Sequence, residues 1–381
     1  MRQLLMVRYG EIYLKGQNRP FFLNLLRQRL KKAVLPYGGV VTLSDGRYYV
    51  TDYSDEHATI QAIQKVFGVH SLCIAVEMNK ESFEDIQNTA ADMIDGYNGT
   101  FKVQSRRSDK RYSLTSPEIN REIGAYILNR HPHLSVDVHN PDHVMSVEIR
   151  DHAYLYIKIL SGPGGMPVGS NGKATLLLSA GIDSPVAGYL IAKRGVELSA
   201  VHFFSYPYTG ERSKDKVIQL ASKLSAYCCG MKLYIIPFTE IQMEIYQKSF
   251  SDHTTLIMRR FMMRLAERIA LLDGAQALIT GESIGQVASQ TMEAIVCTDA
   301  VVNKPVFRPL IGFDKVDIIR LAEEIDTYET SCLPYEDCCT VFTPKHPVTR
   351  PKIERVLKAE APLDIDALID RAIKGVEVIE L

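Results

Sequence analysis

The fold of the largest part of this chain is decided by the stretch Leu176-Leu177-Leu178-Ser179-Ala180-Gly181-Ile182-Asp183-Ser184-Pro185. The three leucines predict the end of a buried parallel strand. The small residues after them predict a tight turn, and Pro185 suits the first turn of a helix, where its missing N–H is tolerated. Such a turn directs several backbone N–H groups and two hydroxyls to one point, beside the positive end of a helix dipole. The stretch therefore predicts a cradle for a pyrophosphate group.

Residues 179–184 follow a Ser-x-Gly-x-Asp-Ser spacing that resembles the PP-loop of enzymes that split ATP into AMP and pyrophosphate. Ala180 departs from that family's pattern, which usually has a second glycine there. The Gly-rich stretch 165–173 does not resemble a Walker A loop, because Pro167 stands in place of its first glycine. Ala174 likewise replaces the hydroxyl that would hold magnesium. The sequence therefore argues against a kinase or a GTPase.

The length and composition are those of a globular protein with several domains. A chain of 381 residues has room for two or three domains with their own cores. No apolar run is long enough to cross a bilayer, and the apolar start at 1–8 is too short for a signal peptide, so we expect no membrane association. The cysteines number seven, which is odd, and show no disulfide framework. This usage predicts a reducing, cytoplasmic location.

Positive charge is concentrated at the amino-terminal end. The formal net charge of the chain is −1, but residues 1–50 contain nine Lys or Arg residues against Glu11 and Asp45, a net charge of +7. The remainder must then carry about −8. Such an asymmetry indicates a localised surface for a polyanion, and the alternative is an ordinary solvated helix face.

Two α+β modules precede the pyrophosphate cradle. Residues 1–55 alternate strand, helix and two strands, with turns at Gly38-Gly39 and Asp45-Gly46. Residues 56–160 continue the alternation, and one of their strands runs into a basic, hydroxyl-rich and aromatic loop within 101–112. Arg and Lys in such a loop supply affinity for phosphates, and Tyr can stack on a base. The candidate RNA-binding residues are Lys102, Arg106, Arg107, Lys110 and Arg111.

The segments 101–112, 116–124 and 136–142 resemble a THUMP domain, a module of enzymes that modify tRNA. The alternative is a structural α+β domain with a charged loop. The Gly-rich segment 161–172 has the composition of a linker. Residues 173–381 then alternate strands and helices as a doubly wound parallel sheet does.

Ligands of doubly wound sheets bind at the carboxyl ends of the strands. This rule predicts one pocket from 179–184, His202-Phe203 and 280–283. The small residues of the cradle would hold phosphates, while Asp183 would hold magnesium or orient the loop, since a carboxylate beside a triphosphate needs a cation between them. The phosphate-binding candidates are Ser179, Gly181 and Ser184.

Other residues are candidates for contacts with a nucleotide. The backbone of Leu177 and Leu178 could meet an adenine edge, and His202-Phe203 could stack on the ring or hydrogen-bond to it. Gly281 would let backbone approach the ligand, and Gln290 could contact purine or phosphate. In Arg259-Arg260 we expect one arginine to reach the nucleotide and its neighbour to lie on the surface. Lys315 follows the predicted N-cap Asp314 and opposes the helix dipole, which suggests a functional role.

Cysteines gather in a late loop. Cys332, Cys338 and Cys339 lie in a Pro-bounded segment with acidic neighbours, which predicts accessible thiols and a redox or sulfur-carrying role. An iron–sulfur cluster is the alternative, but adjacent cysteines do not readily both bind one, and no C-x-x-C is present. We therefore expect no metal centre built from protein ligands.

Together these parts resemble the tRNA 4-thiouridine synthetase (tRNA sulfurtransferase) family over the whole chain. The resemblance implies a ferredoxin-like domain at 1–55, a THUMP domain at 56–160, a linker at 161–172 and a PP-loop domain at 173–381. It also implies that ATP, with Mg²⁺, adenylates O4 of uridine 8 of tRNA, and that a cysteine persulfide then delivers sulfur. The residues that match the family's nucleotide contacts are Leu177, Leu178, His202, Phe203, Arg259, Gly281 and Gln290.

Asp183 and Lys315 match residues expected to matter for activation, and the sulfur-bearing cysteine is Cys338 or Cys339, with a slight preference for Cys339. The chain ends too soon after Cys339 for the rhodanese-like domain that some members carry. We therefore expect a cysteine desulfurase to hand sulfur directly to the late loop. The resemblance also implies sulfur supply to the carrier protein of thiamine thiazole synthesis. A homodimer is a separate expectation, since the sequence does not fix the oligomeric state. The alternatives are another PP-loop adenylating synthetase and a non-catalytic tRNA-binding protein.

Overall fold

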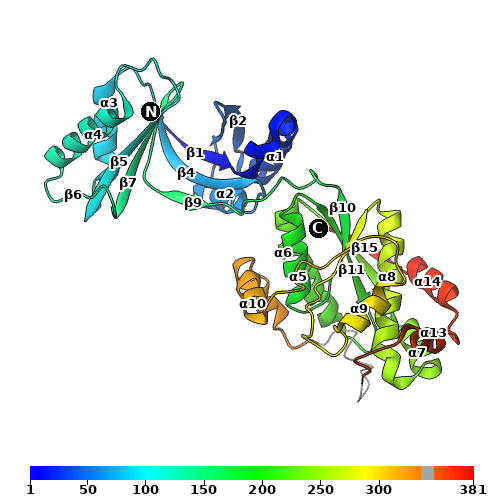
Figure 1. The fold of residues 1–381 in the computed structure, drawn as a ribbon. Helices are drawn as coiled ribbons and strands as arrows, with labels where there is room; N and C mark the ends of the chain where they lie inside the picture. The colour runs from blue at the N-terminus through cyan, green and yellow to red at the C-terminus, as the bar shows by residue number, and fades with distance from the viewer. Residues whose placement is uncertain (336–346) are drawn as a thin grey trace. The chain divides into compact units, whose positions relative to one another are not determined.

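The computed structural model describes residues 1–335 and 347–381 and divides them into two compact units, Met1–Met166 and Pro167–Leu381 (Figure 1). Each unit has its own sheet. The boundary between them falls within the Gly-rich segment 161–172. Among the described helices, none combines the length and the apolar character needed to span a bilayer.

The first unit is built on a nine-stranded sheet with the order β2-β3-β1-β4-β8-β7-β5-β6, and β9 also pairs with β4. Its elements are β1 (Arg2–Tyr9), α1 (Arg19–Val34), β2 (Val40–Ser44), β3 (Arg47–Thr51), α2 (Glu56–Ile63), β4 (Val69–Met78), α3 (Phe83–Ile94), β5 (Thr100–Arg107), α4 (Ser116–Arg130), β6 (Ser135–Val136), β7 (His143–Ile149), β8 (Ala153–Tyr156) and β9 (Ile159–Ser161).

Strand β4 joins the two halves of this unit. It pairs with β1 from Val69 to Glu77, and its last three residues, from Val76 to Met78, pair with β8. Leu72 belongs to the apolar core under α1 and α2, while Met78 belongs to the core under α3 and α4. Because these residues are six apart on one strand, they lie on the same face of the sheet. The four helices therefore cover one face.

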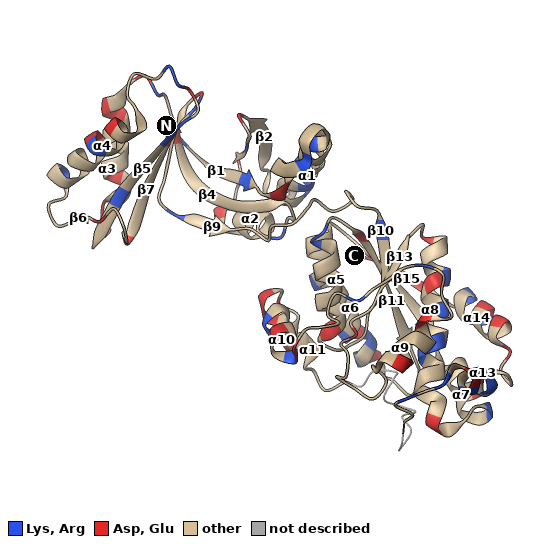
Figure 2. Cartoon of the chain, viewed as in Figure 1, with Lys and Arg blue, Asp and Glu red and all other residues tan. Residues whose placement is uncertain are grey.

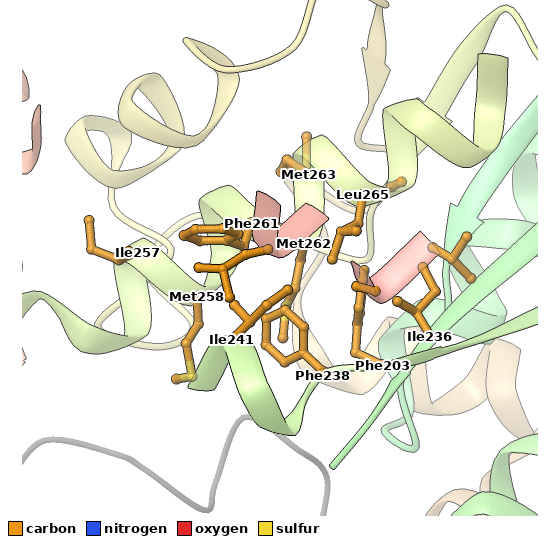
Figure 3. Close-up of a cluster of buried hydrophobic side chains, with 14 of the residues drawn as sticks. Phe203, Ile236, Phe238, Ile241, Ile257, Met258, Phe261, Met262, Met263 and Leu265 are labelled. Carbon is orange, nitrogen blue, oxygen red and sulfur yellow. The ribbon is translucent and has the colours of Figure 1, made fainter. Parts of the chain in front are cut away.

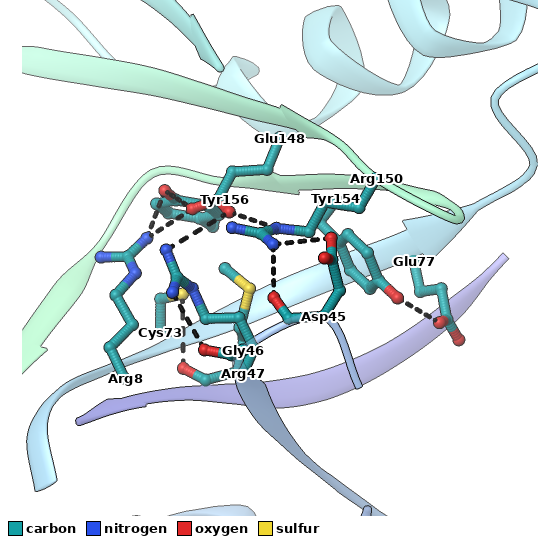
Figure 4. Close-up of polar contacts among 11 residues, drawn as sticks. Arg8, Asp45, Gly46, Arg47, Cys73, Glu77, Glu148, Arg150, Tyr154 and Tyr156 are labelled. Atoms are coloured by element: carbon teal, nitrogen blue, oxygen red, sulfur yellow. Dashed lines mark hydrogen bonds and ion pairs between the residues drawn. The ribbon is translucent and has the colours of Figure 1, made fainter. Parts of the chain in front are cut away.

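The opposite face holds a small apolar cluster, which includes Met6, Cys73 and Tyr156, beneath a polar network (Figure 4). The centre of the network is the Glu148 carboxylate, whose side chain is only 2% exposed. The guanidinium groups around it come from both halves of the unit. Its contacts are Arg150 at 2.7 Å, Tyr156 Oη at 2.9 Å, Arg8 at 3.1 Å and Arg47 at 3.8 Å, and Arg150 also binds Asp45 at 2.8 Å.

This network makes a prediction about stability. Burial raises the pKa of Glu148, but the charges of Arg150, Arg47 and Arg8 outweigh burial and hold that pKa below its ordinary value. Glu148→Gln should lower the free energy of unfolding at pH 7 by about 3–5 kcal/mol, because it leaves buried cations without their anion.

The pH dependence of that loss follows from the sign of the shift. Because folding lowers the pKa of Glu148, its carboxylate stabilises the folded state above the unfolded-state pKa. This stabilisation is lost as the pH falls through the folded-state pKa. The difference in unfolding free energy between wild type and Glu148→Gln, measured by chemical denaturation, should therefore decrease below about pH 4.3. Glu122→Gln, on the exposed face of α4, is the control and should change stability by less than about 1 kcal/mol. A difference in unfolding free energy that is the same at every pH would contradict the stabilising role assigned to the Glu148 carboxylate.

The second unit is a doubly wound sheet with the order β14-β13-β10-β11-β12-β15, in which only β15 is antiparallel to its neighbour among the described strands. Its elements are β10 (Lys173–Leu177), α5 (Asp183–Ala192), β11 (Glu197–Phe204), α6 (Glu211–Cys228), β12 (Lys232–Pro237), α7 (Thr239–Lys248), α8 (Thr254–Leu272), β13 (Ala277–Ile279), α9 (Met292–Asp299), β14 (Val306–Phe307), α10 (Lys315–Glu324), α11 (Tyr328–Ser331), α13 (Ile353–Glu360), α14 (Ile365–Lys374) and β15 (Glu377–Glu380). The predicted fold class is confirmed.

The connections of this sheet place a crevice at β10. The chain goes from β10 to β11 on one side, and β13 later pairs on the other side. Helices α5 and α6 cover one face and α8 covers the other (Figure 1). The order of the strands thus reverses at β10, and ligands of such sheets bind outside the carboxyl end of the strand at this point.

Helix α8 is buried on most of its surface, and its methionine and phenylalanine side chains fill the core between α7 and the sheet (Figure 3). Arg260 lies inside this core, only 2% exposed, although the sequence predicted it at the surface; that prediction is wrong. Its guanidinium binds both carboxylate oxygens of Glu360 at 2.8 Å. Helix α13, which carries Glu360, covers this side of α8, and no sequence pattern predicted that packing.

Candidate active site

A cavity of about 300 Å³ opens at the predicted crevice. The carboxyl ends of β10 and β13, the start of α5 and one side of α8 form its walls. Seven of the residues that the sequence predicted individually as nucleotide or phosphate contacts line the cavity: Leu177, Ser179, Asp183, Ser184, Arg259, Gly281 and Gln290. The other lining residues are Thr255, Met262, Met263, Thr280, Glu282, Val287 and Ser289.

The phosphate loop, residues 179–184 after β10, is held in a closed turn by its own hydroxyl groups. The backbone N–H of Ser179 donates to Ser184 Oγ at 2.9 Å, and the two hydroxyl oxygens lie 3.1 Å apart. The backbone N–H of Gly181 donates to Ser179 Oγ at 3.2 Å. Helix α5 starts at Asp183, so its positive end faces the cavity. These bonds fix a concave arrangement of the kind that binds phosphates.

Gly281 is required by the packing of this loop. A Cβ at position 281 would lie 2.8 Å from the backbone nitrogen of Ser184 and 2.9 Å from the carbonyl carbon of Asp183. The strand end after β13 therefore touches the start of α5 with no room for a side chain. The sequence predicted a close approach at this glycine; the structure shows that the approaching group is the loop itself.

Gly281→Ala should displace the phosphate loop, since backbone atoms cannot yield as a flexible side chain would. We expect a loss of about 100-fold in kcat/KM for ATP, the size expected when a reacting group moves by about 1 Å. Steady-state kinetics at varied ATP would measure it. Gly312→Ala is the matched control, because a Cβ there meets nothing within 4 Å. Equal kinetics for the two variants would refute the role assigned to Gly281.

Asp183 and Lys315 form an ion pair at the mouth of the loop. Lys315 Nζ, in the first turn of α10, lies 2.5 Å from Asp183 Oδ1. Gln286 Nε2 donates to the other carboxylate oxygen at 2.9 Å. The Lys315 ammonium, whose charge is unfavourable at the positive end of α10, is thus held by the carboxylate of Asp183, 132 positions away along the chain. Sequence reasoning assigned no role to Gln286.

Glu282 organises a second charged group on the cavity wall. This carboxylate is 4% exposed, accepts hydrogen bonds from Thr280 Oγ1 and Arg308 Nε at 2.7 Å, and forms an ion pair with Arg259. Arg259 also donates to the backbone oxygen of Ser289 at 2.8 Å. Two arginines therefore neutralise the buried carboxylate and hold one guanidinium at the cavity. The sequence placed Glu282 in the pocket without a role, and missed Arg308.

Four of the predicted nucleotide contacts do not line the cavity: Leu178, Gly181, His202 and Phe203. The His202 ring is 2% exposed, and its Nδ1 lies 3.0 Å from the carbonyl oxygen of Leu178. The Phe203 ring packs in the core against Phe238 (Figure 3). The side chains of His202 and Phe203 are therefore part of the core.

Cys338 and Cys339 lie outside the described residues, but the segment that leads to them is anchored at the cavity. Ser331 Oγ donates to the carbonyl oxygen of Gly181 at 3.4 Å. Lys216 Nζ, from α6, donates to the carbonyl oxygen of Leu333 at 2.8 Å. Residues 331–333 are thereby tied to the phosphate loop and to the helix beside it. Among the described residues, no group of three His, Cys, Asp or Glu side chains could hold a metal ion.

Basic residues of the first unit lie on α1 and around β5 (Figure 2). Helix α1 has five Lys or Arg residues and no acidic residue. Around β5, Arg106 and Lys110 are exposed, and Arg107 donates to the backbone oxygen of Tyr112 at 3.1 Å. Arg111 makes two hydrogen bonds to Asp109, at 3.0 and 3.2 Å. Lys102 lines a groove of about 720 Å³ between β5 and α4.

Family models of known proteins match three successive parts of this chain. A family model described as thiamine biosynthesis protein (ThiI) matches residues 169–365, a THUMP domain model matches 80–158, and a ThiI ferredoxin-like domain model matches 4–73. A probable tRNA sulfurtransferase of Acetivibrio thermocellus is 50% identical over 100% of this chain and 99% of its own length. The chain belongs to the tRNA sulfurtransferase family.

Further relatives agree with this assignment. A probable tRNA sulfurtransferase of Caldanaerobacter subterraneus is 49% identical, with 100% of both chains covered. The crystal structure of a 4-thiouridine synthetase–RNA complex with bound ATP is similar with a TM-score of 0.92 and 38% identity, and both chains are covered completely. PH1313 from Pyrococcus horikoshii is similar with a TM-score of 0.67 and 26% identity, over 85% of this chain and 99% of its own. The family resemblance predicted from sequence is confirmed.

Proposed function

We propose that this tRNA sulfurtransferase uses ATP to adenylate O4 of uridine 8 in tRNA and then replaces that oxygen with sulfur from a cysteine persulfide. The observation that carries the proposal is the closed phosphate loop with the Asp183–Lys315 pair at its mouth. The family membership, and the ATP and RNA bound in the similar 4-thiouridine synthetase structure, support the choice of substrates.

The proposed reaction has three displacements. O4 of the uridine attacks the α-phosphorus of ATP, pyrophosphate leaves and the N3 proton is lost. The terminal persulfide sulfur then bonds to C4 and AMP leaves with the electrons of the C4–O4 bond. A second thiol attacks the inner sulfur, which breaks the S–S bond, leaves 4-thiouridine and forms a disulfide that a thiol reductant must restore. Adenylation is needed because a carbonyl oxygen is a poor leaving group.

The cavity offers a group for each charge in the first displacement. The start of α5 would bind phosphate oxygens, while the N–H groups of Ser179 and Gly181, which donate within the loop, hold its shape. Lys315 would stabilise charge that develops on the leaving pyrophosphate, and Asp183 holds its ammonium in place. Asp183 is also the carboxylate that would hold Mg²⁺, which the nucleotide would bring with it and which would neutralise phosphate charge. Only the backbone of Leu178, His202 and Phe203 would lie at the strand ends beside the nucleotide, because the side chains of His202 and Phe203 are buried.

The anchored segment supports a sulfur-carrying role for the late cysteines. Tyr335 follows the two anchor points at Ser331 and Leu333, and Cys339 is four residues farther along the chain. Four residues of extended chain span at most about 14 Å between α-carbons, so the anchor points limit how far the chain can carry a thiol at position 338 or 339. We assign the persulfide to one of this pair, Cys339 in preference, and the resolving thiol to the other.

The first unit would bind tRNA through α1 and through Lys102, Arg106, Arg107, Lys110 and Arg111, which carry positive charge on the modules proposed at 1–55 and 56–160. A cysteine desulfurase is the proposed sulfur donor in the cytoplasm, where tRNA is available. Sulfur supply to the carrier protein of thiamine thiazole synthesis is a second proposed role, and a homodimer is the proposed assembly.

The test is a reaction of purified protein with unmodified tRNA, ATP, cysteine and a cysteine desulfurase, followed by mass spectrometry of the nucleosides. We expect 4-thiouridine at position 8 together with AMP and pyrophosphate. A non-catalytic tRNA-binding protein would release no pyrophosphate. Another PP-loop synthetase would release pyrophosphate in the presence of a different acceptor and leave uridine 8 unchanged.

A further inference from the structure

The loop between β11 and α6 exposes two tyrosines at the carboxyl edge of the second sheet. The exposed fraction is 62% for Tyr206 and 47% for Tyr208. The ring of Phe204 lies 6.3 Å from that of Tyr206 at an angle of 34°. The loop therefore presents large aromatic surface to solvent at the edge where the cavity opens.

The base of this loop is fixed. Ser205 and Thr209 are buried, and they are joined by a hydrogen bond from the Ser205 N–H to Thr209 Oγ1 at 3.1 Å and one from the Thr209 N–H to the Ser205 oxygen at 2.9 Å. Thr239 Oγ1, from α7, donates to the carbonyl oxygen of Tyr206 at 2.7 Å. The tyrosines are thus carried by an ordered turn, so a ligand that stacks on them meets a surface that is already formed.

The position of the loop relates it to the proposed chemistry. Strand β11 is hydrogen-bonded to β10 in parallel register, with Leu177 opposite Val201. The phosphate loop and the tyrosine loop therefore leave neighbouring strands, which are about 5 Å apart, at the same edge of the sheet, and β11 runs three residues farther, to Phe204. The start of α6, which follows the tyrosine loop, also holds the segment 331–333 through Lys216.

A base that reacts at C4 has to leave its stack before O4 can reach the α-phosphate, because the enzyme cannot reach that atom inside stacked RNA. An aromatic surface recovers part of the lost stacking energy and accepts any base. We propose that Tyr206 and Tyr208 form a stacking platform for the unstacked base or bases of tRNA at the modification site. This inference rests on the proposed function, for which it names the residues that receive the target.

The test measures tRNA binding directly, in the presence of a non-hydrolysable ATP analogue, and then the KM for tRNA in thiolation. Tyr206→Ala and Tyr208→Ala should each weaken binding by about tenfold or more and raise KM by a similar factor. The conservative variants Tyr206→Phe and Tyr208→Phe keep the ring and should stay within about twofold of wild type. Affinity for the ATP analogue alone should not change in any of these variants.

Tyr246→Ala is the matched control, because this tyrosine of α7 is 64% exposed and lies on a helix rather than in the loop. Equal tRNA affinity in the alanine variants and wild type would overturn the platform. So would phenylalanine variants as weak as the alanine ones, or a change of oligomeric state in place of a change in affinity. If wild type binds tRNA through the loop but forms no thiouridine, the proposed function fails and the platform stands.

Discussion

Replacement of Asp183 by Asn is expected to lower tRNA-dependent pyrophosphate release by about 100- to 1,000-fold, the loss typical of removing one preorganised charged group from a reaction centre. The amide keeps the size of the side chain and can still accept a hydrogen bond from Gln286. It removes the charge that holds the Lys315 ammonium 2.5 Å away at the mouth of the phosphate loop. Quenched-flow measurement of pyrophosphate under single-turnover conditions would follow the adenylation step itself.

Lys315→Met should produce a loss of similar size, and the double variant should be little worse than either single one, because the two groups act as a unit. Asp314→Asn is the matched control: it alters the neighbouring, exposed carboxylate, which makes no capping hydrogen bond to its helix. Thermal unfolding should show that all four variants remain folded. Full pyrophosphate release by Asp183→Asn would remove the pair from the mechanism.

The second large effect concerns sulfur transfer alone. Cys339→Ser, or Cys338→Ser if the neighbour carries the persulfide, should abolish 4-thiouridine formation while pyrophosphate release continues, because a hydroxyl cannot carry sulfane sulfur. Radiolabelled cysteine supplied through a desulfurase would show which variant still acquires sulfur. The loss of product should be about 1,000-fold or more, the scale expected when a covalent nucleophile is removed.

Controls for this prediction come from the remaining cysteines. Burial raises the pKa of Cys73 to about 12, and burial also raises the pKa of Cys228, so neither is a thiolate near neutral pH. Cys332 is exposed and lies at the start of the late loop, so Cys332→Ser tests whether any nearby thiol could carry the sulfur. We expect that variant to remain active. Labelled sulfur on Cys73 or Cys228 in the wild-type protein would refute the assignment.

Local signals made the phosphate loop predictable. The apolar run ending at Leu178 and the small residues after it predict a strand and a turn, and the structure has both; α5 begins at Asp183, which places Pro185 in its first turn. Glycine in a strand end signalled close approach at Gly281. Its partner in that approach could not be read from sequence, because the backbone of Ser184 reaches it only in the folded sheet.

Long-range pairing explains what the sequence did not reveal. The face of α8 that carries Arg260 looked solvated, because nothing local shows that Glu360, 100 positions later, covers it. The Glu282 pair with Arg308 and the Glu148 network are likewise built between distant segments. The family resemblance marked Asp183 and Lys315 as residues that matter for activation, but nothing in the sequence showed that they pair. Charged residues paired across a core give no periodic pattern that a single sequence could display.

The ten-residue strand β4 limits how the first unit can be divided. One edge of it completes the sheet under α1, and the other edge carries the strands under α3 and α4. A fragment cut on either side of β4 would leave one half with a bare row of amide and carbonyl groups, which invites aggregation. Engineered hybrids should therefore exchange both modules together, with all of β4 from one parent.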